Sequence, residues 1–325
     1  MSASLYPAIP PEKYVELELL NAASDQTWLV DSVIKPELPQ VIETLTRCLE
    51  MITSSTQPIK LALTSSRTEQ AKGVITRIGD EIVDLDVTLS LNTFSKKLRL
   101  KMKPQCHLQL LQWTELIKLV NTALTDVVIL QECEQFDEFF SQLNKVMVCL
   151  GKCNTAINNP HFDVLFPQHK MDLTTVFDSD GNLLEHYKDR LTMDFFLLNS
   201  EITLELKSLT TVTEEPWNEI DSQGNSHADR LRDDLKHHRI QLNDVLEHEK
   251  HGLFSQMFHK FTAHDYLTRA ITFHDRVVIE VEKLSINCQD PVLLAVGAKL
   301  NGVEHLISKM YKNLDLVMMS LDQKK

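Results

Sequence analysis

The pattern of apolar and polar positions divides the chain into helical and extended segments. The longest regular stretch covers nine apolar positions, spaced three or four residues apart, at Leu293, Val296, Leu300, Val303, Ile307, Met310, Leu314, Val317 and Leu321. This spacing places the side chains on one face of a helix. Because so long an apolar stripe is stable only when covered, we predict that partner helices pack along it.

Three shorter helical stripes precede this one. They comprise Leu38, Ile42, Leu45, Leu49 and Ile52; Leu110, Trp113, Ile117, Val120, Leu124 and Val127; and Phe136, Phe139, Leu143, Val146 and Leu150. We predict an antiparallel bundle in which helices from residues 38–53 and 107–153 cover the stripe of the last helix. Residues 1–36 start with several prolines, so we expect them to begin irregularly and become helical near Trp28.

Extended segments follow the first of these stripes. Residues 83–91 alternate strictly between apolar and polar side chains, which is typical of a half-buried strand, and residues 97–102 do the same with basic residues between the apolar ones. A turn at residues 92–95 then pairs the two strands. The pairs are Leu89 with Leu98, Val87 with Leu100, Leu85 with Met102, Asp86 with Lys101, and Thr88 with Arg99. Apolar and charge pairing agree in this register, so we predict a hairpin.

Two glycine pairs precede that hairpin, and they raise the alternative of a phosphate-binding loop. A P-loop places its lysine after the second glycine and continues into a helix, whereas Lys72 precedes Gly73 here and a strand follows. We therefore predict a strand pair with Gly79-Asp80 as a two-residue type II′ turn, Val74 facing Leu85 and Thr76 facing Val83. A glycine inside a strand, as at Gly73, marks a bulge or a close backbone approach.

A second hairpin is predicted at residues 191–212, a further strand at 276–286, and a loop with turn chemistry at 161–190. The predicted fold class is therefore α+β, with a helical bundle built from both chain ends and a central helix pair, joined to a small antiparallel β-meander domain. The predicted ranges are 1–56, 105–158 and 287–325 for the bundle, and 57–104 and 159–286 for the β domain, with an acidic, His-rich insertion at about 213–275.

Composition narrows the function classes. The net charge of −13 disfavours nucleic acid and anionic lipid as partners, and only 8 glycines are present for phosphate-binding loops. The six cysteines form no CxxC pair, and Cys149 and Cys153 are spaced as two core residues on one helix face. The beginning of the sequence lacks the features of a signal peptide, and no apolar run approaches the length of a membrane span. We expect a reduced, cytoplasmic protein.

The histidines are the main candidates for chemistry, because eight of the thirteen fall between His227 and His274. The sequence HEKH at residues 248–251 is one residue shorter than the zinc-binding motif HExxH. His248 and His251 are three residues apart and can share a helix face, as can His237 or His238 with other histidines nearby. A solvated polar helix is the favoured interpretation, and a metal-dependent enzyme is kept as a remote alternative. We predict no catalytic, cofactor-binding or metal-binding residues.

Trp217 and Ile220 lie in an otherwise acidic segment. A bulky apolar pair among charged residues is typical of a short docking segment, so these two residues are our candidates for partner binding. The alternative is that they attach their own loop to the domain.

The stretch TEQAKGVITRIGDEIVDLDVTLSL, followed after a basic strand by HLQLLQ, resembles the signature of the Rogdi family. The matching positions are Thr68, Gln70, Lys72, Gly73, Val74, Thr76, Gly79, Asp80, Asp86 and Val87, followed by Leu108, Gln109 and Gln112. The order of elements is also similar. The acidic, His-rich stretch departs from the shorter animal relatives. By this resemblance, we expect the signature residues mainly to hold the shape of the meander.

The resemblance implies an adaptor without catalysis or a cofactor. Fungal members are the second subunit of the RAVE complex, which regulates assembly of the vacuolar and endosomal proton-ATPase. The implied partners are a large propeller-containing scaffold subunit, a Skp-type ubiquitin-ligase adaptor and the peripheral ATP-hydrolysing sector, with recruitment from the cytoplasm to vacuolar or endosomal membranes. The alternative is a coiled-coil scaffold or tether in vesicle trafficking, in which the stripe at 293–321 pairs between molecules.

Overall fold

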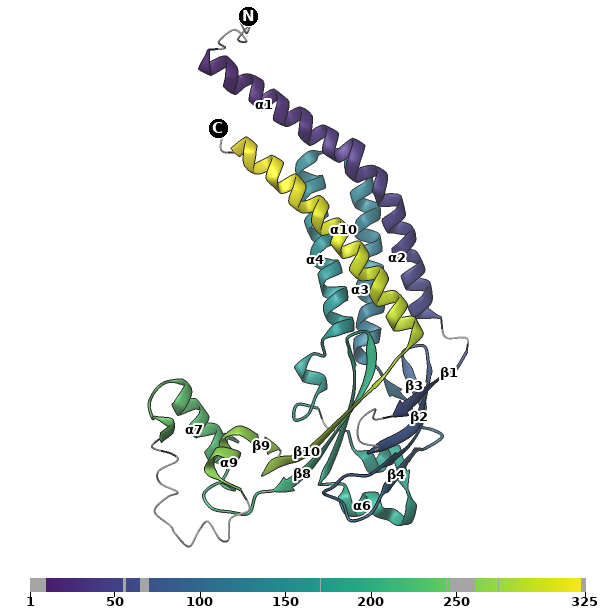
Figure 1. Cartoon of the computed structure of the whole chain (residues 1–325), viewed down its shortest axis with the longest axis vertical. Coiled ribbons are helices and arrows are strands. Elements are labelled where there is room, and N and C mark those ends of the chain that lie inside the picture. Colours follow the sequence, from purple (N-terminus) through teal and green to yellow (C-terminus); the bar gives the residue numbers. More distant parts are fainter. Residues whose placement is uncertain are drawn as a thin grey trace, which may run out of the picture. The chain divides into compact units, whose positions relative to one another are not determined.

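The computed structural model describes residues 10–54, 57–64, 70–169, 171–243, 245, 261–273 and 275–322. The chain forms two compact units. The helical unit comprises Met1–Ser55, Gln112–Asn159 and Asp290–Lys325, and the β unit comprises Thr56–Leu111 and Pro160–Gln289. Both kinds of element are visible in Figure 1, and the predicted α+β class with helices and a β-meander is confirmed.

The helical unit is built from long helices, with short helical turns between the first two. They are α1 (Pro11–Trp28), the π-helical η1 (Leu29–Ile34), the 3-10 η2 (Lys35–Glu37), α2 (Leu38–Thr53), α3 (Leu111–Glu132), α4 (Phe136–Asn158) and α10 (Pro291–Asp322). The prediction of an irregular start up to about Trp28 is wrong, because the helix begins at Pro11. A proline suits the first turn of a helix, where its missing N–H has no partner to lose.

The stripe of α10 is buried as predicted from Leu293 to Leu314, and α10 packs against α2, α4 and α1. In α2, however, Val41 and Cys48 are buried, whereas the predicted Ile42 and Leu49 are only partly so. The difference amounts to a small rotation of the helix about its axis. A helix surrounded by several neighbours buries a broader stripe than the narrow seam of a two-stranded coiled coil.

Sheet A of the β unit contains six strands, in the order β1-β2-β3-β4-β6 with β5 paired to β3. The strands are β1 (Ile59–Thr64), β2 (Ala71–Ile78), β3 (Glu81–Leu89), β4 (Leu98–Met102), β5 (Leu108–Gln109) and β6 (Phe177–Ser179). The predicted β3–β4 register is confirmed, with Leu89 opposite Leu98 and Asp86 opposite Lys101.

The β2–β3 hairpin differs from its predicted register. Gly79 adopts a positive φ of 58° in the turn, but a bulge at Val83 on β3, opposite Thr76 and Arg77, shifts the pairing by one residue. Thr76 therefore lies opposite Asp84 instead of Val83, and Leu85 lies opposite Ile75 instead of Val74. A bulge adds one unpaired residue to a strand without altering the apolar pattern near the turn, so it escapes a pattern-based prediction.

Gly73 confirms the expected close approach of two backbones. A Cβ atom at this position would lie 2.2 Å from the carbonyl oxygen of Asp86 and 2.7 Å from the Cα atom of Val87 on β3. These distances are far below van der Waals contact, so only glycine fits here without a shift of the backbone.

Sheet B has the order β7-β8-β10-β9, formed by β7 (Leu191–Leu198), β8 (Glu201–Thr211), β9 (Ala270–Phe273) and β10 (Arg276–Cys288). The predicted hairpin at 191–212 and the strand at 276–286 are confirmed. Asn199 and Ser200, with φ of 51° and 62°, form the two-residue β7–β8 turn. Between β8 and β9, the described residues include α7 (His227–Lys236) and α9 (Ala263–Arg269), while His248 and His251 lie outside the described residues.

The loop predicted at 161–190 instead contains several short elements. They are η3 (Phe162–Val164), α5 (Leu173–Val176), β6, η4 (Asp180–Asn182) and α6 (Leu183–Tyr187). β6 adds an edge strand to β4, and this long-range pairing has no signature in the local pattern. Within the part of the chain that the structure describes, no helix combines the length and the hydrophobicity needed to cross a bilayer.

Candidate functional site

The two predicted partner-binding residues, Trp217 and Ile220, lie between β8 and α7 and are partly buried. The ring of Trp217 stacks on that of Tyr266 in α9, with centroids 4.7 Å apart, and meets the ring of His227 edge-on at 5.2 Å. Both residues pack on a buried cluster of Val212, Ala228, Tyr266, Ala270, Val277 and Ile279. They therefore support the fold of their own unit, as in the intramolecular alternative, and a partner contact stays a prediction.

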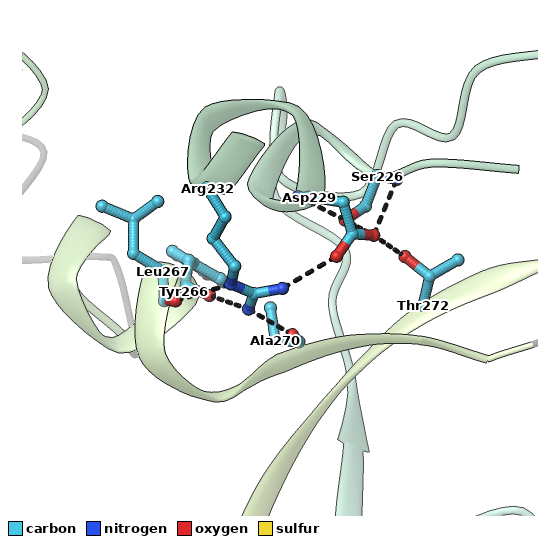
Figure 2. A network of polar contacts seen from close by, with 7 residues as sticks. All are labelled: Ser226, Asp229, Arg232, Tyr266, Leu267, Ala270 and Thr272. Carbon is cyan, nitrogen blue, oxygen red and sulfur yellow. Dashed lines mark hydrogen bonds and ion pairs between the residues drawn. The ribbon is translucent and has the colours of Figure 1, made fainter. Parts of the chain in front are cut away.

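A polar network next to this cluster fixes the start of α7 (Figure 2). The Ser226 hydroxyl accepts a hydrogen bond from the backbone N–H of Asp229 at 3.1 Å, and the Asp229 carboxylate accepts one from the backbone N–H of Ser226 at 3.0 Å. This reciprocal arrangement is a capping box, which satisfies two otherwise unpaired donors. The same carboxylate accepts the hydroxyl of Thr272 on β9, so the cap also joins α7 to sheet B.

Arg232 extends the network from α7 to the end of α9. Its guanidinium forms an ion pair with Asp229 at 2.8 Å and donates to the carbonyl of Leu267 at 2.7 Å and to that of Tyr266 at 3.2 Å. It also donates to the carbonyl of Ala270, the first residue of β9. The last carbonyls of a helix have no partner within the helix, and Figure 2 shows the planar guanidinium reaching this group of carbonyls.

The pKa shifts of two groups in this region, Asp229 and His227, also indicate a structural role. Burial raises the pKa of the Asp229 carboxyl, but the hydrogen bonds from Thr272 and Ser226 outweigh burial, and the pKa lies below its ordinary value. Asp229 is therefore ionised at neutral pH and holds its partners firmly. Burial also lowers the pKa of His227, which stays neutral beside Trp217. We interpret this network as structural: it connects the elements that surround the hydrophobic cluster, and it is not a proton-transfer site.

Sheet B carries a second group of charged side chains. Glu205 bridges two lysines, with oxygens 2.9 Å from Lys207 Nζ and 2.7 Å from Lys283 Nζ. Burial opposes the charge on Glu205, but the hydrogen bonds from Lys283 and Lys207 lower its pKa overall. On the neighbouring strand Asp194 accepts the backbone N–H of Phe166 at 3.2 Å, and burial raises its pKa. The group fastens the segment around Phe166 over the sheet.

Gln70, a signature residue, helps to join the two sheets of the β unit. Its side-chain amide donates to Glu282 Oε1 at 3.0 Å, at the bulge in β10. The Glu282 carboxylate also accepts the backbone N–H groups of Asn92 and Thr93, each at 3.1 Å, from the β3–β4 connection. Hydrogen bonds from N–H groups to a carboxylate are stronger than those between neutral groups. Because all of these bonds end on Glu282, this residue is the centre of the junction between the sheets.

Other signature residues lie on the exposed face of sheet A. They line a shallow hollow of about 510 Å³ formed by Lys60, Lys72, Gly73, Val74, Thr76, Asp84, Asp86, Thr88 and Arg99. The Arg99 guanidinium binds the Asp86 carboxylate through two hydrogen bonds, of 2.9 and 2.7 Å, which lower the pKa of Asp86. The hollow is open to solvent and carries side chains of both signs of charge, unlike a typical small-molecule pocket.

The remaining signature residues have structural positions, except Thr68, which lies outside the described residues. Gly79 and Asp80 form the β2–β3 turn, and Val87 is fully buried. Sequence reasoning missed Arg77, which is buried beside that turn and donates to the carbonyl of Gly79 at 2.7 Å. Its one signal was a charged residue next to the apolar Ile78 at the end of the strand, close to the predicted turn.

The described residues contain no group of three His, Cys, Asp or Glu side chains arranged to hold a metal ion. All six cysteines are free thiols, and the two predicted core residues, Cys149 and Cys153, are buried. Burial also raises the pKa of Cys48 to about 11, so this thiol is protonated at neutral pH.

Comparison with known proteins identifies the family. The family model described as Rogdi leucine zipper containing protein matches residues 25–315, from the end of α1 into the last turns of α10. The chain belongs to the Rogdi family. The resemblance seen at the signature is thereby confirmed over most of the chain.

One relative is similar to this Rogdi chain over nearly its whole length. It is Regulator of V-ATPase in vacuolar membrane protein 2 from Saccharomyces cerevisiae, which is 28% identical over 320 residues. The alignment covers 90% of this chain and 91% of the relative. It therefore spans both units and not the signature alone.

Proposed function

We propose that this protein is a non-catalytic subunit of a RAVE-type assembly factor, which promotes reversible reassembly of the peripheral ATP-hydrolysing sector of the vacuolar proton-ATPase onto its membrane sector. The observation that carries the proposal is the similarity to a yeast regulator of the V-ATPase over 90% of the chain. Similarity over both units favours a shared role of the whole protein, including its regulation of this ATPase.

The architecture supports an adaptor role. The polar networks at Asp229 and Glu282 join secondary-structure elements to one another, and the hollow on sheet A is shallow and polar. Such surfaces suit contacts with other proteins better than the enclosed binding of a substrate. The name of the relative describes regulation, and neither its name nor the family description names a reaction.

The proposed partners are the large propeller-containing scaffold subunit of the complex, a Skp-type ubiquitin-ligase adaptor and subunits of the peripheral sector. The proposed location is the cytoplasm, with recruitment to vacuolar or endosomal membranes. Trp217 and Ile220 are the proposed partner-binding residues. Both side chains are partly buried, and the partner would contact the part that remains exposed.

Two measurements test this function. The tagged protein, purified from cytosol, is expected to bring down the scaffold subunit and subunits of the peripheral sector, and its loss is expected to raise vacuolar pH. The proposal is wrong if neither kind of subunit co-purifies and vacuolar pH stays normal. An equimolar, tightly bound zinc in the purified protein would instead favour the metal-dependent alternative.

The structure of α10 argues against the alternative function as a coiled-coil tether. Leu300 is completely buried within the chain, and the stripe around it packs on helices of the same unit. Pairing of α10 between molecules would require the bundle to open, with exposure of the faces of α2 and α4. A domain-swapped dimer that is dissolved by Leu300→Asp without loss of folding would restore this alternative.

A further inference from the structure

α1 carries a second seam with heptad spacing, and it is exposed. Tyr14, Leu17, Asn21, Ser24 and Trp28 recur at alternating spacings of three and four residues. The side chains of Tyr14, Leu17 and Trp28 are 57%, 45% and 60% exposed, and the two polar residues between them are exposed as well. In α2, by contrast, the buried stripe that begins at Leu38 is almost completely covered. The seam of α1 therefore has large apolar side chains toward both ends, a polar middle, and no cover within the described residues.

A different side of α1 faces the bundle. α1 packs against α10 (Figure 1). Among the α1 side chains whose exposure the structure describes, Glu18 and Gln26 are partly buried, and Leu29, just after the helix, is buried. At about 100° per residue, these positions lie roughly a third of a turn around the helix from the exposed seam. The seam is therefore accessible to a further helix while α1 remains attached to α10.

The exposed apolar surface favours a cover. Most helical stability in proteins comes from packing of an apolar face. Leu20 adds to the apolar surface next to the seam, with 62% of its side chain exposed. We propose that α1 is a docking helix, and that its seam binds a helix of a different polypeptide that carries Lys or Arg beside its own apolar stripe.

Charge identifies the chemistry of that partner. Asp25 is exposed on one edge of the seam, whereas Glu18, one heptad earlier on the same edge, is partly buried. Residues at such flanking positions select the partner helix through opposite charges. The whole chain carries a net charge of −13, which favours a basic segment over an acidic one.

A second copy of the chain fits this seam poorly. In a parallel pair, Ser24 would meet another serine and leave a gap between the two helices, whereas good packing sets a large side chain against a small one. In an antiparallel pair, the edges that carry Glu18 and Asp25 would face each other and repel. A partner with a leucine opposite Ser24 would fill the gap, and a polar side chain at the level of Asn21 would satisfy its amide.

The test uses the purified full-length protein and a fluorescent synthetic peptide. The peptide has about four heptads, with leucine in the seam, one central asparagine and lysine at both edges, so that its own charge keeps it monomeric. Fluorescence anisotropy is expected to show binding that Leu17→Asp weakens at least about tenfold, and that Asp25→Lys weakens at least about threefold. A peptide with glutamate at both edges is expected not to bind.

Two controls separate docking from general charge attraction. A scrambled peptide of the same composition should bind no better than the glutamate peptide. Val148→Asp changes a residue on α4 that is 48% exposed, close to the exposure of Leu17, and should leave binding unchanged. Circular dichroism confirms that the variants remain folded.

The proposal fails if Leu17→Asp and Val148→Asp affect binding equally, or if the scrambled peptide binds as well as the patterned one. It also fails if sedimentation shows a dimer that Leu17→Asp dissolves, because a second copy would then occupy the seam. None of these outcomes depends on the proposed role in proton-ATPase assembly, which the co-purification experiment tests separately.

Discussion

Arg232 offers the sharpest test of how the region between β8 and β10 is held together. Its guanidinium connects α7 to the carbonyls of Tyr266 and Leu267 in α9 and to the carbonyl of Ala270 in β9. Replacement by methionine keeps much of the apolar stem and removes every one of these donors. The perturbation therefore acts on the junction and not on the hydrophobic cluster beside it.

The size of the effect follows from the exposure of the group. A hydrogen bond that involves a charged group contributes about 1.5–3 kcal/mol, and these bonds are not additive. The Arg232 side chain is 34% exposed, so water replaces part of what is lost. We therefore expect Arg232→Met to lower the local opening free energy of α9 by about 2 kcal/mol, or about thirtyfold in the opening equilibrium.

Hydrogen exchange followed by mass spectrometry measures this local opening directly. Peptides that cover Ala263–Arg269 should exchange about thirtyfold faster in Arg232→Met, while peptides from α10 should be unchanged. The matched control is Arg239→Met, since Arg239 follows the same helix but forms only exposed ion pairs with Asp233 and Asp234. Equal exchange in the two variants would refute the reasoning.

Three further predictions concern other parts of the chain. Gly73→Ala should destabilise the protein by about 3 kcal/mol in thermal unfolding, because the new Cβ has no room. Gly302→Ala, with open space in α10, should instead stabilise it by about 0.5–1 kcal/mol. A Gly73→Ala variant with unchanged stability would contradict the close approach of the two backbones. Asp290→Ala should cost about 1 kcal/mol in urea unfolding, since its carboxylate caps α10 through the N–H groups of Val292 and Leu293, and Asp290→Asn should retain most of the stability. Because the pKa of Glu205 is lowered in the folded protein, ionised Glu205 stabilises the fold above the ordinary glutamate pKa. This contribution should disappear as the pH falls through the lowered pKa of the folded state. A Glu205→Gln variant with the same acid-unfolding profile as the original protein would argue against it.

Features that local interactions determine could be predicted from the sequence. The β3–β4 register could be predicted because one alternation fixes which side chains face the core, and the opposed charges of Asp86 and Lys101 agree with it. The stripe of α10 could be predicted for the same reason, since its period is visible within the helix itself. Both elements carry their complete pattern in adjacent residues.

Other features depend on contacts between distant parts of the chain. The β6 edge strand has only three residues and exists because it pairs with β4. The bulge at Val83 leaves no trace in the apolar pattern. In α1, Asn21 and Ser24 interrupt the apolar seam and Val15 lies away from it, so no continuous apolar face distinguishes the helix from an irregular segment.

The candidate site illustrates the same limit. The sequence shows Trp217 as a bulky side chain among acidic residues, but it does not show that Tyr266 lies ready to stack on it. Nor does the sequence show that Gln70 reaches a carboxylate on β10, because the two residues are more than 200 positions apart. The residue types drew attention to these segments, and only the tertiary structure could supply the contacts that their side chains make within the chain.

The junction at Glu282 has a consequence for how the protein is made. During synthesis the β3–β4 connection leaves the ribosome long before Glu282, which provides the acceptor for the N–H groups of Asn92 and Thr93. The bundle is completed later still, because the stripe of α10 comes last. Neither unit can be completed before its late strand or helix has been made. The nascent protein therefore exposes the apolar faces of its earlier elements until then, and a truncation just before α10 should leave a chain that aggregates.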